Sequence, residues 1–143
     1  MFNIHATLIS FHNKGILLTG KSGVGKSDVA LRMIMEKGAV LVADDRVDLV
    51  CANGNLFGSC PKNIRGLLEV RNVGIGQFKH KAKVKISLCV ELCEDKKDLE
   101  RLPDNEYVDF LGVSVTKLKL YAFDCSILCK IIAKIDGYIR QEV

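Results

Sequence analysis

The feature of the sequence that most constrains its fold is a glycine-rich loop, Gly20-Lys21-Ser22-Gly23-Val24-Gly25-Lys26-Ser27. It matches in full the phosphate-binding pattern G-x-x-x-x-G-K-[ST], which requires a strand before the loop and a helix after it. The flanking residues predict both: 14–19 is a short apolar run, and 28–37 carries apolar residues at helical spacing before Gly38. A plain glycine turn before a helix is the alternative, and the agreement of the flanking elements favours a phosphate loop (residues 20–27).

The chemistry of the phosphate loop explains the residue types found in it. Glycines let the backbone turn its N–H groups toward phosphate oxygens, and the helix N-terminus adds partial positive charge. Lys26 can reach the β- and γ-phosphates of a nucleotide, and the Ser27 hydroxyl can ligate Mg²⁺. The loop therefore predicts a site for ATP with Mg²⁺.

Two adjacent carboxylates, Asp44 and Asp45, follow the apolar stretch 39–43, which is typical of a strand covered on both faces. Ligands of open α/β sheets lie beyond the carboxyl ends of the strands, so both carboxylates are expected near the nucleotide phosphates. There a carboxylate can hold Mg²⁺ or accept the proton of an attacking hydroxyl. Two solvated loop aspartates, one of them paired with Arg46, are the alternative.

Length and composition fit a single globular domain over residues 1–143. The chain is 48% hydrophobic and 27% charged, and is long enough to bury a core without disulfides or a structural metal. Its net charge of +4 suits a phosphate-bearing ligand but is too weak to indicate nucleic-acid binding. No apolar run approaches the ~20 residues of a membrane span, and residues 1–14 lack the features of a signal peptide. A cytoplasmic protein without a membrane or nucleic-acid partner is therefore expected.

The rest of the chain is dominated by strand patterns, with an Asn-Gly turn at 53–55 that predicts a hairpin. An amphipathic pattern over 127–139 predicts a final helix, whereas the glycine-rich segment 64–76 has no clear assignment. Because strands dominate the second half, we expect an α/β fold with a mixed sheet and few helices, and not an all-parallel doubly wound sheet. The predicted strands cover residues 4–10, 14–19, 39–43, 46–50, 56–57, 83–92, 107–111 and 113–120.

The six cysteines allow two interpretations. Cys89 and Cys93, like Cys125 and Cys129, are four residues apart, so a four-cysteine zinc site is conceivable. The alternative is reduced thiols that pack as small hydrophobic groups. The nucleotide site and the lack of a secretory signal favour this second interpretation.

Three segments, in order, carry a resemblance to a known family. They are the phosphate loop, Leu41-Val42-Ala43-Asp44-Asp45-Arg46-Val47 and Leu68-Glu69-Val70-Arg71-Asn72-Val73-Gly74-Ile75. Together they resemble the motifs of the HPr kinase/phosphorylase catalytic domain, and the resemblance runs from about His5 to Ile139. It implies a nucleotide-binding core like that of the phosphoenolpyruvate carboxykinases. Larger family members carry an extra N-terminal domain, continue past the last helix and form hexamers, so the resemblance also implies a homo-oligomer.

The resemblance implies a role for each matching residue. The implied catalytic residues are His5, Lys26, Asp44 and Arg101. The implied magnesium ligands are Ser27, Glu69 and Asp45, and the phosphate loop holds the nucleotide. The resemblance matches Asp44 to the aspartate that accepts the seryl proton in the forward reaction and donates it in the reverse one, with Asp45 as the alternative. Residues 69–78 cover the stretch that the family ties to catalytic efficiency.

Without the resemblance, some of these residues have ordinary explanations. His5 would be a partly buried strand histidine. Glu69 and Arg71, two apart on an extended segment, would pair on the surface. Arg101 lies in the charged connection 95–105 and would be solvated.

The chain departs from the family pattern at two places. Asn72 stands where the family usually has glycine, which puts the local backbone in question. Residues 121–126 contain neither Arg nor Pro, whereas the family has there a loop with both that is associated with dephosphorylation. Kinase chemistry is therefore expected, and phosphorolysis is in doubt.

The leading hypothesis is an ATP- and Mg²⁺-dependent protein-serine kinase that acts on HPr or a related phosphocarrier and so regulates carbohydrate metabolism through the phosphotransferase system. One alternative is a nucleotide-binding regulator without transfer activity, for which the lost arginine loop would be the sign. A second alternative is a kinase that uses the same phosphate loop on a small molecule.

Overall fold

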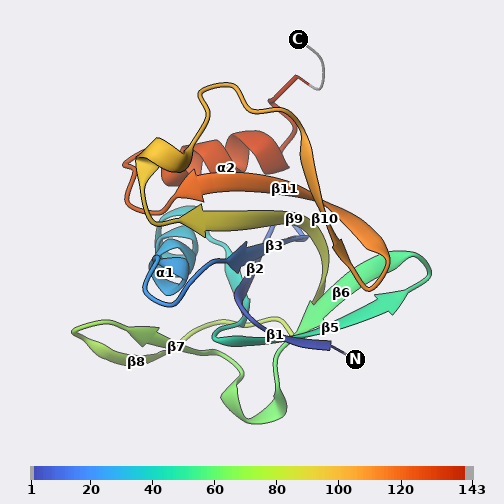
Figure 1. The fold of residues 1–143 in the computed structure, drawn as a ribbon. Coiled ribbons are helices and arrows are strands. Elements are labelled where there is room, and N and C mark those ends of the chain that lie inside the picture. The colour runs from blue at the N-terminus through green and yellow to red at the C-terminus, as the bar shows by residue number, and fades with distance from the viewer. Residues whose placement is uncertain (1, 141–143) are drawn as a thin grey trace.

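The computed structural model describes residues 2–140, which form a mixed β-sheet, a small two-stranded sheet and two α-helices (Figure 1). The helices are α1 (Lys26–Lys37) and α2 (Ile127–Ile135), with short 3-10 helices at Lys62–Ile64 and Lys96–Asp98. The separate small sheet is a hairpin of β7 (Leu67–Val70) and β8 (Gly74–Gln77). The strands of the main sheet are β1 (Phe2–His5), β2 (Thr7–Phe11), β3 (Lys14–Thr19), β4 (Val40–Ala43), β5 (Arg46–Ala52), β6 (Asn55–Ser59), β9 (Lys83–Cys93), β10 (Glu106–Phe110) and β11 (Val113–Tyr121).

The long strand β9 organises the main sheet. The strand order is β1-β5-β6-β9-β3-β2-β4, and β11, with β10 beside it, also pairs with β9. β3 and β11 run parallel to β9, whereas β6 runs antiparallel to it. The sheet is therefore mixed, which confirms the prediction from the sequence.

Both faces of the central strands are buried. In β3, Ile16 and Leu18 belong to the apolar cluster that includes α1 and α2, whereas Leu17 belongs to a second cluster with residues of β5 and β6. All of β2 is buried as well. A strand covered on both faces needs apolar residues at successive positions, which explains why β3 and β4 are continuous apolar runs in the sequence.

Helix α1 begins inside the phosphate loop and ends at a glycine. It starts at Lys26, two positions before the predicted range 28–37, and ends at Lys37 as predicted. Gly38 adopts a φ of 73°, and its N–H donates to the Ile34 carbonyl at 3.2 Å. This left-handed conformation ends the helix and satisfies one of its last carbonyls.

Two predicted elements were wrong in their extent. The expected strand over 4–10 is two strands, because its pairing breaks at Ala6, whose N–H donates to the Asp45 carbonyl at 3.2 Å. β1 then pairs with β5, whereas β2 pairs with β3 and β4. The final helix, predicted over 127–139, ends at Ile135, because Gly137 has a φ of 81° that a right-handed helix does not contain.

The cysteines are free thiols in different surroundings. Cys60 and Cys89 are buried, and burial raises the pKa of both thiols. The other thiols are partly or fully exposed. Among residues 2–140, no group of three or more histidine, cysteine or acidic side chains is arranged to hold a metal ion. The two buried thiols therefore pack as small hydrophobic groups.

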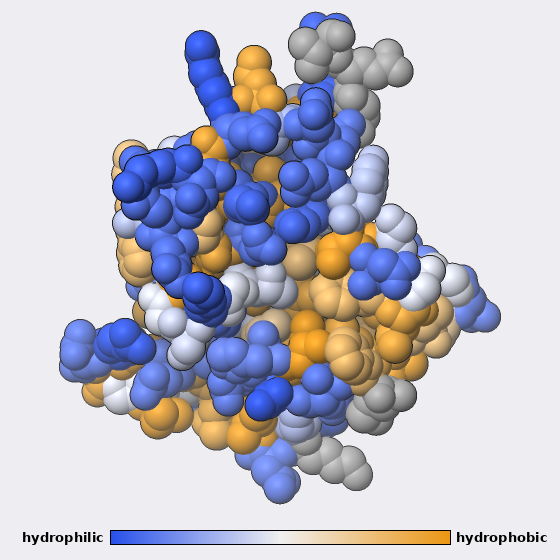
Figure 2. All heavy atoms as spheres, in the orientation of Figure 1, coloured by the Kyte–Doolittle hydropathy of each residue, from blue (hydrophilic) through white to orange (hydrophobic). Residues whose placement is uncertain are grey.

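The surface seen in Figure 2 is divided in its polarity. Polar residues cover the region of α2 and its neighbouring loops, whereas apolar residues gather toward the end of the sheet formed by β5 and β6. Phe2 of β1 and Val50 of β5 are both exposed. No helix within residues 2–140 is long and apolar enough to cross a membrane.

The packing of α1 yields a matched pair of substitutions. Met33 is completely buried in the cluster between the helices and the sheet, so Met33→Ala should lower the free energy of unfolding by about 2–5 kcal/mol. Met35 lies on the same helix and is 69% exposed, so Met35→Ala should change the free energy of unfolding by less than about 0.5 kcal/mol. Urea unfolding followed by circular dichroism measures both values. Equal losses would contradict the helix orientation described here.

Candidate active site

A pocket of about 600 Å³ lies where the phosphate loop, the β4–β5 connection and the β7–β8 hairpin meet. Because β2, β4 and the phosphate loop all reach this end of the sheet, the pocket collects side chains that are distant in the sequence. Its lining residues are His5, Thr7, Ser22, Gly23, Gly25, Lys26, Ser27, Asp28, Leu31, Asp44, Asp45, Glu69, Val70, Arg71 and Phe123. Most of the residues predicted for the site are therefore brought together.

The phosphate loop takes a backbone conformation that requires glycine. Gly20 has a φ of 136° and Gly25 a φ of 106°, both in the region that L side chains rarely adopt. A Cβ at Gly25 would also lie 2.7 Å from the Cβ of Ala122. Of the predicted loop residues, Gly20, Lys21 and Val24 do not line the pocket: Val24 is buried in the core, and the Lys21 ammonium pairs with Glu94 at 3.3 Å.

Lys26 lies across the phosphate loop. Its ammonium donates to the carbonyls of Gly20 at 2.7 Å and Lys21 at 2.9 Å, which leaves one of its three N–H groups for a ligand. Burial lowers the pKa of Lys26, while the nearby Asp44 and Asp45 act in the opposite direction. An anionic ligand beside this ammonium would offset the cost of burying its charge.

Asp44 is held by two hydroxyl groups. Its Oδ1 accepts hydrogen bonds from Ser27 Oγ and from Thr7 Oγ1, each at 2.9 Å. Within residues 2–140 its Oδ2 has no hydrogen-bond partner, and the carboxylate lines the pocket. Thr7, which is 1% exposed, was not among the residues predicted for the site. The signal in the sequence is a hydroxyl side chain in an otherwise mostly apolar strand. The carboxylate is thus oriented by one oxygen and open at the other.

Asp45 adopts a strained backbone and pairs with His5. Its φ is 70°, and the N–H of Arg46 donates to the carbonyl of Asp44 at 2.8 Å, the pattern of a rare γ-turn. His5 Nε2 lies 2.9 Å from Asp45 Oδ1. Arg46 donates to Asn3 Oδ1 at 3.4 Å and, within the described residues, pairs with neither aspartate. The Asp45 carboxylate is thus 70% exposed but paired with His5, and the pairing with Arg46 considered from the sequence is not found within the described residues.

The β7–β8 hairpin supplies one wall of the pocket. Glu69 of β7 and Arg71 of the turn both line it, and residues 2–140 contain no ion pair between them. Asn72 has a φ of 70°, a conformation that glycine adopts freely and asparagine tolerates, which accounts for asparagine at this position. Arg101 does not join them: it is exposed and does not line the pocket.

The segment 121–126, which lacks the arginine and proline of the family loop that it resembles, presents an aromatic ring to the pocket. Phe123 lines the pocket, whereas Asp124 does not. The Asp124 carboxylate instead accepts from Lys130 Nζ at 2.7 Å and from the N–H and Oγ of Ser126 at 3.3 and 3.2 Å. These bonds lower the pKa of Asp124 to about 2, with the Lys130 contact as the largest cause. Asp124 therefore stabilises the start of α2.

The donors at this site fit a Mg²⁺ ion that keeps part of its own water shell. Mg²⁺ prefers oxygen ligands and is usually held by one or two carboxylates together with water and substrate phosphates. The pocket offers the Ser27 hydroxyl and the carboxylates of Asp44, Asp45 and Glu69. Within residues 2–140 no three acidic, histidine or cysteine side chains converge on a metal position by themselves. The arrangement therefore fits a metal completed by nucleotide oxygens better than a closed protein cage.

Comparison with known proteins gives one family. The model of the HPr Serine kinase C-terminal domain matches residues 1–137. The chain is 39% identical over 125 residues to the HPr kinase/phosphorylase of Clostridium botulinum (strain Eklund 17B / Type B), a match that covers 80% of this chain and 41% of that protein. It is 39% identical over 127 residues to that of Clostridium perfringens (strain SM101 / Type A), covering 82% and 41%. The chain thus spans about two fifths of the length of these relatives.

A solved structure shows the same fold. The HPr(Ser) kinase/phosphatase from Coxiella burnetii superposes with a TM-score of 0.83, over 96% of this chain and 97% of that chain, at 24% sequence identity. This match confirms the predicted α/β fold with a mixed sheet around the phosphate loop.

The pairing of Asp124 predicts a pH-dependent contribution to stability. Its folded pKa of about 2 is below the ordinary value of 3.8, so its contribution is present above about pH 4 and is lost as the pH falls toward 2. Asp124→Asn should therefore lower the stability at pH 7, and the difference from the wild type should shrink between pH 4 and pH 2. Urea unfolding at each pH measures this difference in the free energy of unfolding. Asp104→Asn, at an exposed position without a partner in the described structure, is the control, and a pH-independent difference for Asp124→Asn would contradict the assignment.

Proposed function

Because the chain belongs to the HPr serine kinase C-terminal domain family, whose model matches residues 1–137, we propose that it is the catalytic domain of an ATP- and Mg²⁺-dependent protein-serine kinase. The observation that carries the proposal is the 2.9 Å contact between Ser27 Oγ and Asp44 Oδ1. It joins the end of a phosphate-binding loop to a carboxylate with a free oxygen. Transfer of a phosphoryl group to a hydroxyl needs both functions in one pocket.

The nucleotide phosphates would lie along the phosphate loop. Its backbone N–H groups and the N-terminus of α1 provide positive potential for them. The free N–H of Lys26 would donate to the transferred phosphoryl group, and Arg71 lies in the same pocket to offset further charge. We assign this second role to Arg71, since Arg101 does not line the pocket.

Ser27, Asp45 and Glu69 are the residues we propose to hold Mg²⁺. When bound, the ion neutralises charge on the β- and γ-phosphates. His5, 2.9 Å from Asp45, would keep that carboxylate oriented toward the pocket. This gives His5 a positioning role in place of direct contact with the reacting atoms.

Asp44 is the proposed proton acceptor. The hydroxyls of Ser27 and Thr7 hold its Oδ1, so its Oδ2 is left to accept the proton of the attacking serine. As the seryl oxygen forms its bond to the γ-phosphorus, the bond from that phosphorus to the leaving ADP breaks and the proton moves to Asp44. The reverse reaction would need Asp44 to return this proton.

The acceptor we propose is HPr or a related phosphocarrier protein, since the relatives are named HPr kinase/phosphorylase. The reaction would take place in the cytoplasm, within a single catalytic domain over residues 1–143 that assembles with further copies. Phosphorolysis would be weak, because segment 121–126 lacks the arginine and proline of the family loop associated with dephosphorylation. The segment presents Phe123 to the pocket, and its Asp124 carboxylate is bound to Lys130 of α2. Forward transfer is therefore the proposed main activity.

Transfer of labelled γ-phosphate to an HPr-type protein tests the proposal. Asp44→Asn should slow transfer by at least about 100-fold, because the proton acceptor is removed. Asp48→Asn, whose carboxylate contacts Asn3 outside the pocket, should transfer at the wild-type rate. If wild type and Asp44→Asn label equally poorly, the kinase proposal is wrong. ATP turnover without labelled protein would instead favour a small-molecule kinase, and ATP binding without turnover would favour a regulator.

Thr7 is expected to act through Asp44 as a positioning residue. Thr7→Val keeps the shape of the side chain but removes one of the two hydrogen bonds to Oδ1, so kcat should fall about tenfold with little change in KM for ATP. Thr7→Ser restores the hydroxyl and should recover most of the rate. Steady-state kinetics of the three proteins measures the difference. A merely structural role predicts instead that Thr7→Ser, the smaller side chain, is the more damaging change.

A further inference from the structure

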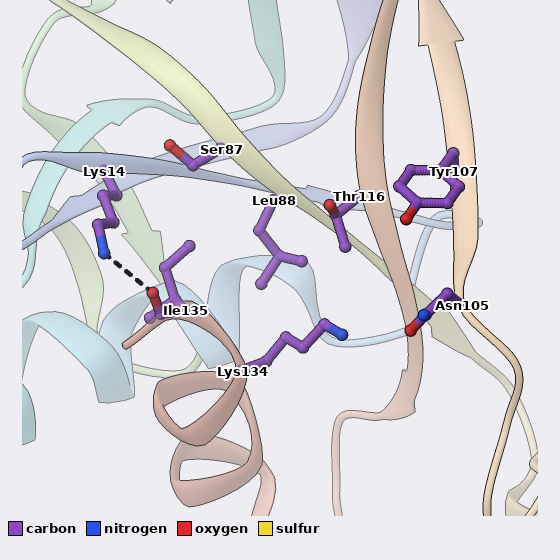
Figure 3. Close-up of a pocket in the computed structure, with 8 residues that line it drawn as sticks. All are labelled: Lys14, Ser87, Leu88, Asn105, Tyr107, Thr116, Lys134 and Ile135. Carbon is purple, nitrogen blue, oxygen red and sulfur yellow. Dashed lines mark hydrogen bonds between the residues drawn. The ribbon is translucent and has the colours of Figure 1, made fainter. Parts of the chain in front are cut away.

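A second pocket, of about 220 Å³, lies at the opposite end of β3 from the phosphate loop (Figure 3). Lys14 begins β3 and Thr19 ends it, so at about 3.3 Å per residue the strand spans about 17 Å between these two residues. The lining residues are Lys14, Ser87, Leu88, Asn105, Tyr107, Thr116, Lys134 and Ile135. None of them lines the candidate active site, so the two pockets are separate.

The walls of this pocket are set by the register of three neighbouring strands. Leu88 of β9 is paired with Thr116 of β11, and Thr116 is paired with Tyr107 of β10. The sheet therefore places an aliphatic side chain and two hydroxyl groups in one row. The C-terminal turn of α2 covers this row from the other side with Lys134 and Ile135.

Both charged groups of the pocket are cationic. The lining contains two lysines and no carboxylate. Lys14 Nζ donates one hydrogen bond, to the Ile135 carbonyl at 3.1 Å, which leaves two of its N–H groups for other acceptors. Lys134 has no ion pair or hydrogen bond from its ammonium within residues 2–140. Figure 3 shows its side chain extended along the pocket, with Leu88 between it and Lys14.

The acidic groups nearest to these lysines in sequence or on the same strands are engaged elsewhere. Asp136 follows the end of α2, but its Oδ1 lies 3.1 Å from His12 Nδ1. Glu106, beside Tyr107 on β10, lies 3.9 Å from Lys117 Nζ. The other lysine of α2, Lys130, is paired with Asp124 at 2.7 Å. Within residues 2–140 no carboxylate lines the pocket, so its charged lining groups are both cationic.

We propose that this pocket binds a small organic anion, with a phosphate or carboxylate head at the Lys134 ammonium and a short apolar body toward Ile135. Charge-assisted hydrogen bonds from lysine are the strong contacts available to such a head, and the Thr116 and Tyr107 hydroxyls add polar partners. The volume of about 220 Å³ is below the roughly 300–1,000 Å³ of pockets for drug-sized ligands, so the ligand is small. The proposal does not depend on the proposed kinase activity.

Titration of the ¹⁵N-labelled chain with propyl phosphate at constant ionic strength tests the proposal by NMR. The amide signals of Ser87, Leu88 and Thr116 should shift and saturate. Lys134→Gln should raise the dissociation constant read from these signals at least about fivefold, because it removes one ammonium. Lys130→Gln is the matched control on the same helix and should leave it unchanged.

Binding at the phosphate loop is read separately, from the signals of Gly23 and Gly25. Shifts confined to those signals would overturn the proposal, as would equal dissociation constants for the Lys134→Gln and Lys130→Gln variants. The neutral alcohol 1-propanol distinguishes the apolar body from the head. Equal shifts with 1-propanol would show that the pocket does not select an anion, and would also overturn the proposal.

Discussion

The hydrogen bonds to Asp44 Oδ1 are the interaction on which the candidate site depends. Thr7 comes from β2 and Ser27 from the first turn of α1, and both donate to the same oxygen at 2.9 Å. Three segments that are distant in the chain therefore meet at one atom. Both donors are short hydroxyl side chains on regular elements, and Thr7 is fully buried, so little freedom remains in the carboxylate. The open Oδ2 is oriented as a consequence, before any ligand arrives.

The backbone conformation around Asp45 also helps to position the side chains of the candidate site. The Asp45 carbonyl accepts the N–H of Ala6, where the pairing of the first strand breaks, and its own φ of 70° belongs to a γ-turn. His5 lies before this break and contacts Asp45, whereas Thr7 lies after it and donates to Asp44. Such strain persists only where the surrounding structure holds it, here the paired strands β2, β4 and β5.

The two pockets lie toward opposite ends of the central strand β3. The phosphate loop follows the end of β3, and the cationic pocket lies at its beginning, so one strand connects the two without sharing a lining residue. The segment 121–126 shows how the same residue types can serve structure or chemistry. The Asp124 carboxylate accepts hydrogen bonds from Ser126 and Lys130 at the start of α2, and Phe123 is the residue of this segment that lines the candidate active site.

The sequence by itself determined the phosphate loop, the strand before it, the helix after it and the carboxylates that follow β4. These features are local: a glycine pattern, an apolar run and a left-handed Gly38 report on backbone conformation and burial within a few residues. Only the tertiary structure decided that the strand at 4–10 breaks at Ala6, that 64–76 contains a hairpin, that Thr7 joins the site and that Arg101 does not line it. The physical reason is that each of these depends on contacts between distant segments. The hydrogen bond from Thr7 to Asp44 spans 37 positions, and no local pattern encodes its partner.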